Sequence, residues 1–201
     1  KIFNHTDQGG RYSFTRQPGI GRWNLQRLQV ALSASMDVTE FTSVIDEYEP
    51  LIQTFYFQQM RQRLGLTQVE PGLARELIAG WLQLLEAHQL DYNRSFIELE
   101  RYVTESAASE LSVVGEAWLR QYLDAVNEAP DIAAMQQVNP VVTLRTHLLS
   151  EVISAAEQGD DAPLTSYLEA LERPFQRCLW GSHWAQPPAE EIAPGSLSCS
   201  S

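Results

Sequence analysis

The amino-acid sequence predicts an all-α protein, and three observations lead to that prediction. Between Pro18 and Pro174, apolar residues recur at steps of three and four, which is the period of an amphipathic helix. Helix-end signals accompany these stretches, such as Asp37 with Glu40 at a start and Gly159 after an end. No run alternates apolar and polar residues as a half-buried strand requires. A length of 201 residues suits one domain with one core.

The N-terminal part is expected to hold two helices after an irregular loop. The first covers RWNLQRLQVALS at residues 22–33. A capping box of Asp37 and Glu40 begins the second. Because proline lacks a backbone donor, we expect a break or kink at Pro50, after which the apolar pattern continues to Gly65.

The strongest periodic signal lies in the next helix. Its apolar face consists of Leu73, Leu77, Trp81, Leu84, Leu85 and His88. This spacing predicts a helix that faces the core, with Leu77, Trp81 and Leu85 buried. His88 shares the stripe, so we interpret it as a hydrogen-bonded core histidine rather than a catalyst.

Four further helices are expected before Pro174. A short one spans residues 92–103, and another, at 114–126, is apolar on two sides and so is expected to be sandwiched. Asn139 as N-cap, Pro140 as first helical residue and Gly159 as the terminating glycine bracket the third. Its predicted buried stripe includes Leu144, Leu148 and Val152. The last helix covers residues 164–171.

These patterns divide the chain into three segments. Residues 1–18 form an irregular N-terminal loop, residues 19–172 form the helical body, and residues 173–201 form an extended C-terminal tail. The tail is rich in Pro, Gly and Ser and has no period. We expect Phe175, Trp180 and Trp184 to lay it over the surface of the body.

Charge and cysteine content exclude several classes of function. Lys and Arg number 14 against 26 Asp and Glu, and the resulting net charge of −12 argues against nucleic acid as a partner. No apolar run reaches the roughly 18 residues of a membrane span. The two cysteines, Cys178 and Cys199, form no C-x-x-C pair, which favours a reducing, cytoplasmic setting.

Titratable pairs in the sequence favour structural roles over catalysis. His5 and Asp7 lie two residues apart, but no third metal ligand is spaced near them. The pairs Asp46/Glu49 and Glu98/Glu100 are interpreted as solvated helix faces rather than as a general acid and base. His147 and His183 have no partner that the sequence identifies. The GGRYSF stretch lacks the spacing of a phosphate-binding loop.

Cys199 lies third from the end of the chain, in SLSCSS. A thiol on a mobile tail would be accessible and could form a mixed or intramolecular disulfide. The chemistry by itself leaves both this redox role and chance placement open.

Four motifs, in order along the chain, resemble the selenoprotein O family, which is also called YdiU. They are NHTDQGGRYSFTRQPGIGRWNLQRL at 4–28, DYNRSF at 91–96, VNPVVTLR at 138–145 and SCSS at 198–201. The resemblance implies the helical C-lobe and helical extension of a protein-kinase-like fold. It also implies transfer of AMP from ATP to protein Ser, Thr or Tyr hydroxyls, with Mg or Mn, in a bacterial cytoplasmic enzyme.

The resemblance also implies which residues this chain lacks. The family's nucleotide-gripping and metal-binding residues precede the first motif, so we expect no catalytic, cofactor-binding or metal residues here and no ATP or metal bound by this chain alone. Residues 1–18 correspond to a kinase activation segment. We expect a pairing of Asp7 with Arg11 to hold that segment. Packing of the Tyr12 ring and of a buried Phe14 ring is expected to anchor it, and Trp23 is expected to seat the first helix.

Cys199 matches a position that is selenocysteine in some members of the family, which favours a redox role. Many relatives have a loop cysteine where this chain has Phe3, so Cys178 is the only internal partner for a disulfide. Two alternatives to the enzyme fragment therefore stand: a stand-alone helical interaction module, and a thiol redox sensor that uses Cys199. The expected partners of the full-length enzyme are protein substrates, with no nucleic acid and no membrane.

Overall fold

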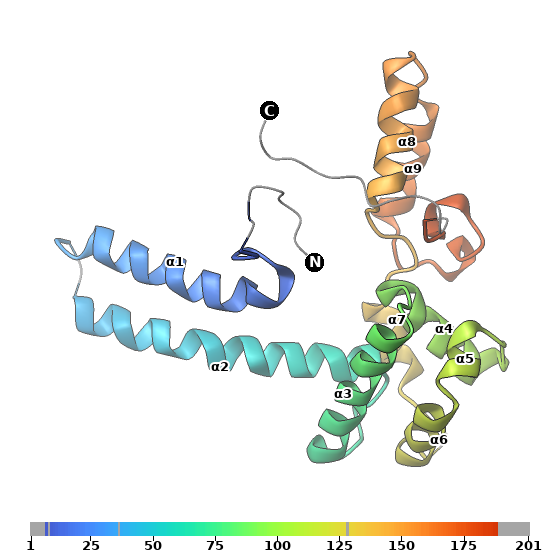
Figure 1. The fold of residues 1–201 in the computed structure, drawn as a ribbon, viewed down its shortest axis with the longest axis horizontal. Helices are drawn as coiled ribbons and strands as arrows, with labels where there is room; N and C mark the ends of the chain where they lie inside the picture. Colours follow the sequence, from blue (N-terminus) through green and yellow to red (C-terminus); the bar gives the residue numbers. More distant parts are fainter. Residues whose placement is uncertain (1–6, 8, 36, 128, 189–201) are drawn as a thin grey trace. The chain divides into compact units, whose positions relative to one another are not determined.

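The computed structural model describes residue 7 and residues 9–35, 37–127 and 129–188, and it confirms the all-α class: these residues form helices and no strand (Figure 1). The chain divides inside one long helix into two compact units, with Phe57 as the last described residue of unit 1 and Gln58 as the first of unit 2. The elements, in order, are η1 (Phe14–Arg16), α1 (Gln17–Leu32), α2 (Val38–Arg63), α3 (Pro71–Ala87), α4 (Tyr92–Glu105), α5 (Glu110–Val114), α6 (Glu116–Ala125), α7 (Ile132–Val138), α8 (Thr146–Glu157), α9 (Ala162–Glu172), η2 (Arg177–Leu179) and η3 (His183–Ala185).

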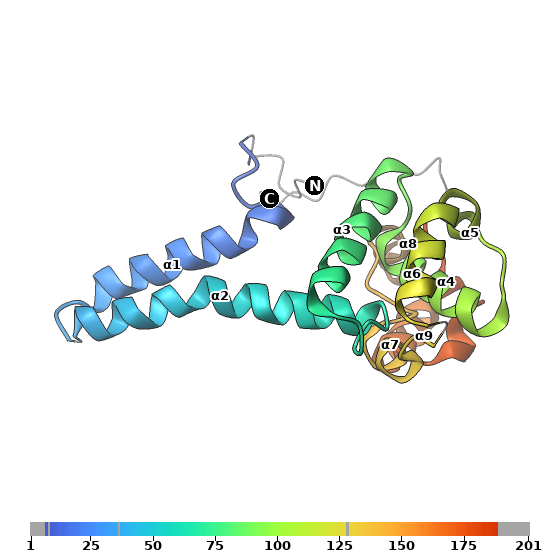
Figure 2. The ribbon, with the colours of Figure 1, turned by 90° about the horizontal axis from the view of Figure 1, so that it is seen from below.

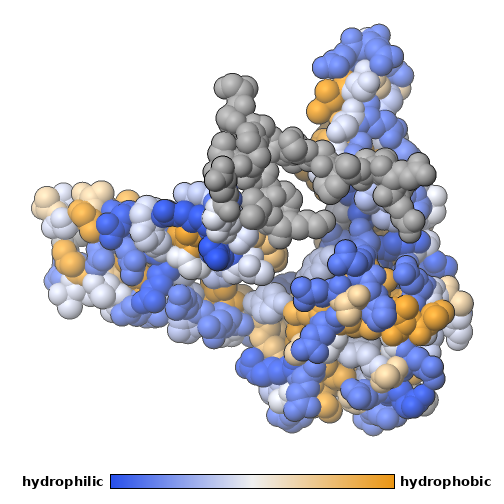
Figure 3. Space-filling model, in the orientation of Figure 1, coloured by the Kyte–Doolittle hydropathy of each residue, from blue (hydrophilic) through white to orange (hydrophobic). Residues whose placement is uncertain are grey.

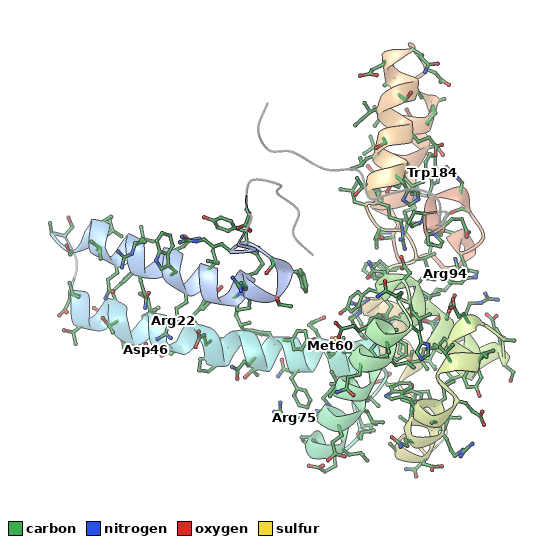
Figure 4. The ribbon with its side chains drawn as sticks, in the orientation of Figure 1. Arg22, Asp46, Met60, Arg75, Arg94 and Trp184 are labelled. Atoms are coloured by element: carbon green, nitrogen blue, oxygen red, sulfur yellow. The ribbon has the colours of Figure 1, made fainter. Side chains whose placement is uncertain are left out.

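Unit 1 is a helical hairpin in which α1 lies beside the first part of α2 (Figures 1 and 2). A Cβ atom added at Gly21 of α1 would collide with the hydroxyl of Tyr48 and would lie 2.9 Å from its Cζ. Next to Gly21, Arg22 donates to Asp46 at 3.0 Å and to Glu49 at 3.5 Å, and the Arg22 and Asp46 side chains point toward one another in Figure 4. Asp46 and Glu49 are thus solvent-facing, as expected, but both pair with α1.

The start of α2 and its passage through Pro50 differ in part from the prediction. Asp37 does cap the helix, since its Oδ1 accepts from the Thr39 amide at 2.7 Å. Among the described residues, however, Glu40 makes no reciprocal bond to the Asp37 amide. The break expected at Pro50 is wrong, because α2 is one helix over Val38–Arg63. A proline removes one helical hydrogen bond, and that loss does not end a helix whose flanking turns are intact.

An aromatic cluster forms the centre of unit 2. The Trp81 ring lies 5.2 Å from Phe96 and 4.9 Å from Trp118, centroid to centroid. The Trp118 indole donates to the Leu77 carbonyl at 3.0 Å, and the Tyr122 hydroxyl donates to the Leu64 carbonyl at 2.9 Å. The predicted burial of Leu77, Trp81 and Leu85 is confirmed. α3 and α6 are therefore held by rings that also satisfy backbone acceptors.

Two helix boundaries in unit 2 correct the prediction. The helix expected at 114–126 is present as α6, but it starts at Glu116, and Val114 instead ends α5. Gly115 separates the two helices, and a Cβ atom there would lie 2.7 Å from the Leu111 carbonyl oxygen. α3 ends at Ala87, so His88 is a C-cap residue with an exposed side chain and not a core histidine. The apolar stripe of α3 ends before His88 because the helix itself ends there: Gln89, the residue after His88, has a positive φ of 54°.

A second apolar cluster joins α8, α9 and the segment after Pro174. Leu148 and Val152 of α8, both buried as predicted, share it with Tyr167 and Ala170 of α9. The predicted contact of Trp180 and Trp184 with the body is confirmed, since both pack against this cluster. α8 and α9 lie side by side in Figure 1.

The start of α8 is a further correction. Asn139 and Pro140 do not begin this helix; α8 starts at Thr146, and Leu144 is 64% exposed rather than buried. The preceding residues are non-helical, and the Val141 and Val142 amides donate to the Pro174 carbonyl, at 2.7 and 3.3 Å, instead of to carbonyls within a helix. The end of α8 is as predicted, with Gly159 at a φ of 86°.

None of the helices in the described part of the chain is both long and apolar enough to cross a bilayer.

Candidate functional site

The N-terminal loop of unit 1 brings four of the five predicted anchor residues together. Asp7 accepts hydrogen bonds from the backbone amides of Arg11 and Tyr12, each at 2.8 Å, through its two carboxylate oxygens. Gly10 sits between them at a φ of 62°, a conformation that glycine adopts without strain. The expected pairing of Asp7 with Arg11 therefore runs through the backbone amide and not through the guanidinium.

The Arg11 side chain contacts aromatic rings instead of a carboxylate. Its guanidinium lies over the Trp23 ring at 4.5 Å and over the Tyr12 ring at 5.7 Å. The Gln17 side chain donates to the Tyr12 carbonyl at 2.6 Å and ties the loop to the first turn of α1. Cation–π contacts at such exposed positions stabilise by about 0.5–1 kcal/mol. The loop is thus held by several weak contacts.

Phe14 does not join this group. Its side chain is 72% exposed, so the burial expected for this ring is wrong, whereas the Tyr12 and Trp23 rings are partly exposed and both contact the Arg11 guanidinium. The reason is local: Phe14 begins the short turn η1, which leads directly into α1 and leaves the ring on the outside. Cys199, Phe3 and His5 lie outside the described residues.

In unit 2, two of the sequence motifs meet around Arg63 at the end of α2. Arg63 Nε donates to Oδ1 of Asn139 at 2.9 Å, and Asn139 Nδ2 donates to the Arg63 carbonyl at 2.8 Å. Arg63 Nη2 also donates to Oδ1 of Asn93 at 3.2 Å. The guanidinium covers the Phe96 ring at 3.7 Å. Asn139 of VNPVVTLR and Asn93 of DYNRSF therefore hold one arginine between them.

A bidentate ion pair joins the same two motifs a second time. Arg145 donates through Nη1 to Asp91 Oδ2 at 2.6 Å and through Nη2 to Asp91 Oδ1 at 2.9 Å. Asp91 also caps α4 by accepting from the Arg94 amide at 2.8 Å. Burial of Asp91 acts to raise its pKa, but the bonds from Arg145 and Arg94 outweigh burial and leave the pKa below its ordinary value.

Glu100 forms the third charged contact and corrects a prediction. It is 3% exposed, and Arg177 donates to both of its oxygens, at 2.9 and 2.6 Å, while Gln136 donates at 3.1 Å. Glu98 is also covered, paired with Arg94 at 2.8 Å. The expected solvated face is therefore wrong for both. The i,i+4 spacing of Arg94 and Glu98 could have revealed the second pair; no local signal reveals Arg177.

In the three contacts just described, the charged groups of Arg63, Asp91 and Glu100 are bonded to other side chains of this chain. Asp91 and Glu100 each face a guanidinium, so neither carboxylate is placed to act as a general base toward a ligand.

Among the described residues, no cluster of three or more His, Cys, Asp or Glu side chains could hold a metal ion. His183 lies 2.8 Å from Glu151 on an exposed surface, and His147, which is partly buried near Arg145, has a lowered pKa, mainly because of burial. We name Arg63, Asp91, Asn139 and Arg145 the motif junction.

Comparisons with known proteins match almost the whole chain. A family model described as "Protein adenylyltransferase SelO" matches residues 2–172. A protein nucleotidyltransferase YdiU from Chromohalobacter salexigens is 40% identical over 207 residues, which cover 98% of this chain and 42% of the relative. Relatives with the same description from Shewanella loihica and Cronobacter sakazakii are 34% and 37% identical and are covered over 45% and 38% of their length. The chain thus spans less than half the length of these relatives.

Proposed function

The chain belongs to the SelO family of protein adenylyltransferases, as the resemblance predicted, and from this membership we propose that it forms the C-terminal helical part of an enzyme that transfers AMP from ATP to protein hydroxyl groups. In this proposal the chain is structural: it completes the helical lobe of a kinase-like fold and presents residues 7–18 as an activation-segment-like loop. ATP and a divalent metal are bound by the part of the enzyme outside this chain.

The observation that carries the proposal is the motif junction. Asp91 and Arg145 belong to different family motifs, 54 residues apart, and form a bidentate pair with each other. Asn139 of the second motif is fully buried against the Arg63 backbone and side chain. The motifs that identify the family thus act within this chain as packing elements, which suits a supporting lobe.

Exposed apolar side chains on unit 1 support the same interpretation. Phe14, Val30, Val44, Leu51 and Phe55 are all largely exposed on the hairpin, where Figure 3 shows apolar side chains in orange among hydrophilic ones. Among the described residues of unit 1, Ile45 is the one buried large apolar side chain. A hairpin with so small a core of its own gains stability by packing against more protein. We propose that the remainder of the enzyme covers these exposed apolar side chains.

The experiment compares the 201-residue chain with the intact enzyme. Transfer of labelled AMP from ATP to protein is expected from the intact enzyme and absent from the chain. Titration calorimetry with Mg-ATP is expected to give binding to the intact enzyme only. Micromolar magnesium-dependent ATP binding by the chain alone would contradict the structural role, and an intact enzyme without AMP transfer would contradict the reaction.

Family membership favours this proposal over a stand-alone interaction module. The redox role of Cys199 stays a prediction from the sequence. Alkylation of that thiol, with the Cys199→Ser variant as control, would show whether enzyme activity responds to it.

A further inference from the structure

A pocket on unit 2, remote in sequence from the N-terminal loop, has the features of a ligand site. It has a volume of about 410 Å³ and is lined by Arg94, Glu98, Arg101, Ala107, Ala108, Ser109, Glu110, Trp180, Gln186 and Pro187. Helix α4 forms one wall of the pocket, and the segment after Pro174 forms another. That volume falls within the range of small-molecule sites. The family match ends at residue 172, before three of the lining residues.

The pocket gathers two guanidinium groups around one aromatic ring. Arg94 lies 4.4 Å and Arg101 5.3 Å from the centre of the Trp180 ring. Arg94 is fixed, because its Nε donates to Glu98 at 2.8 Å and its Nη1 to Gln186 at 3.3 Å (Arg94 is labelled in Figure 4). Arg94 is therefore held in place over the ring, with its charge balanced by Glu98.

Arg101 is held much more weakly. Its one carboxylate partner among the described residues is Glu105, at 3.0 Å, in an i,i+4 pair whose side chains are 36% and 55% exposed. Pairs of this kind stabilise by at most about 1 kcal/mol, so Arg101 can exchange Glu105 for a better acceptor at little cost. A carboxylate or phosphate that receives two parallel N–H bonds is such an acceptor.

We propose that this pocket binds a small organic anion, a carboxylate or a phosphate ester with a flat apolar body. Arg101 binds the anionic group, and the apolar body lies against Ala107 and Pro187, beside the Trp180 ring that the two guanidinium groups cover. Glu110 is the one lining carboxylate without an arginine partner among the described residues, and it opposes the anion.

The test is a titration of the chain with phenyl phosphate, followed by NMR shifts of the tryptophan indole signals, with neutral benzyl alcohol as the reference ligand. Saturable shifts of the Trp180 signal are expected with phenyl phosphate and not with benzyl alcohol. Arg101→Gln is expected to weaken binding by roughly tenfold or more, because it removes a charge-assisted donor pair. Glu110→Gln is expected to strengthen binding, because it removes a like charge.

Arg120→Gln is the matched control. Arg120 forms the same kind of exposed i,i+4 pair, with Glu116 at 2.9 Å, on α6 and outside the pocket. Its substitution is expected to leave the affinity for phenyl phosphate unchanged. Equal affinity in the wild type and Arg101→Gln, weaker binding in Glu110→Gln, or no saturable shift of Trp180 would each overturn the proposal.

Discussion

For single residues, the burial of a side chain decides how much it contributes to stability. Burial cannot be inferred from the residue type alone. Phe14 and Phe96 are both phenylalanines within family motifs, yet the first is 72% exposed and the second is fully buried. Glu100 carries a charge but is buried against Arg177. The partner of a side chain therefore sets its contribution to stability.

Phe14 and Phe96 make a matched pair of truncations. Phe96→Ala removes a ring packed on Trp81 and is expected to lower the free energy of unfolding by about 3–5 kcal/mol. Phe14→Ala removes an exposed ring and is expected to change it by less than about 0.5 kcal/mol, well under the roughly 3 kcal/mol that a buried ring would cost. Urea unfolding of both variants measures the difference, and a large loss in Phe14→Ala would show that the ring is anchored.

Asp91 should make stability depend on pH in the acid range. Its pKa in the folded state lies below the ordinary value that it keeps in the unfolded chain, so the unfolded chain binds the proton more readily. The stabilisation is fully present above that unfolded pKa and is lost as pH falls through the lower folded pKa. Asp91→Asn keeps an N-cap residue but leaves Arg145 unpaired, at an expected cost of about 2 kcal/mol at neutral pH, discounted for partial exposure.

Urea unfolding of the wild type and Asp91→Asn at a series of pH values checks this. The difference between the two proteins is expected to shrink as the pH falls below about 4. A difference that stays constant down to about pH 2 would show that the negative charge of Asp91 is not the source of the stabilisation.

At the scale of helices, the close approach of α1 and α2 in unit 1 depends on Gly21, which has no side chain. Gly21 gives α1 the room to lie against Tyr48 of α2, beside the ion pairs of Arg22. Gly19, two residues earlier on the same helix, faces open space, since no atom lies within 4 Å of the point that a Cβ atom would occupy. The two glycines therefore differ in the space that faces them.

Gly21→Ala and Gly19→Ala are predicted to have opposite effects. Gly19→Ala is expected to stabilise the chain by up to about 1 kcal/mol through helix propensity. Gly21→Ala gains the same propensity but must displace the Tyr48 ring, and overpacking of this kind costs about 1–3 kcal/mol. Thermal unfolding followed by circular dichroism compares them; equal shifts in Tm would mean that the hairpin does not pack closely at Gly21.

For the molecule as a whole, the two units differ in how much apolar surface each buries. Among the described residues, unit 1 buries Ile45, whereas unit 2 contains the aromatic cluster of Trp81, Phe96 and Trp118 and a second cluster around Leu148. Segments with few buried apolar contacts open at lower free energy. Unit 1 on its own is therefore the less stable part of the chain.

Hydrogen exchange can measure this difference amide by amide. Amides in α3 and α6 are expected to exchange at least about tenfold more slowly than those in α1, because their opening must disrupt the aromatic cluster. In the intact enzyme, protection of α1 is expected to rise if the rest of the protein covers the hairpin. Equal protection of α1 and α3 in the isolated chain would contradict the first expectation.

Patterns in the sequence were enough to predict the helical class, the core face of α3 and the family, because helical periodicity and each short motif depend on residues that are close in the sequence. The end of α8 at Gly159 was predictable for the same reason. The start of α8 was not, since the non-helical run before it bonds to the carbonyl of Pro174, which lies more than 30 residues after Val141 and Val142.

The motif junction and the burial of Glu100 depend instead on tertiary packing. Asn139 looks like a helix N-cap when its neighbours alone are considered, but it is buried against Arg63, 76 residues earlier in the chain. Glu100 looks like part of a solvated face, but it is paired with Arg177, 77 residues later. Because packing of whole helices brings such residues together, no spacing rule along the chain reveals that these side chains are partners.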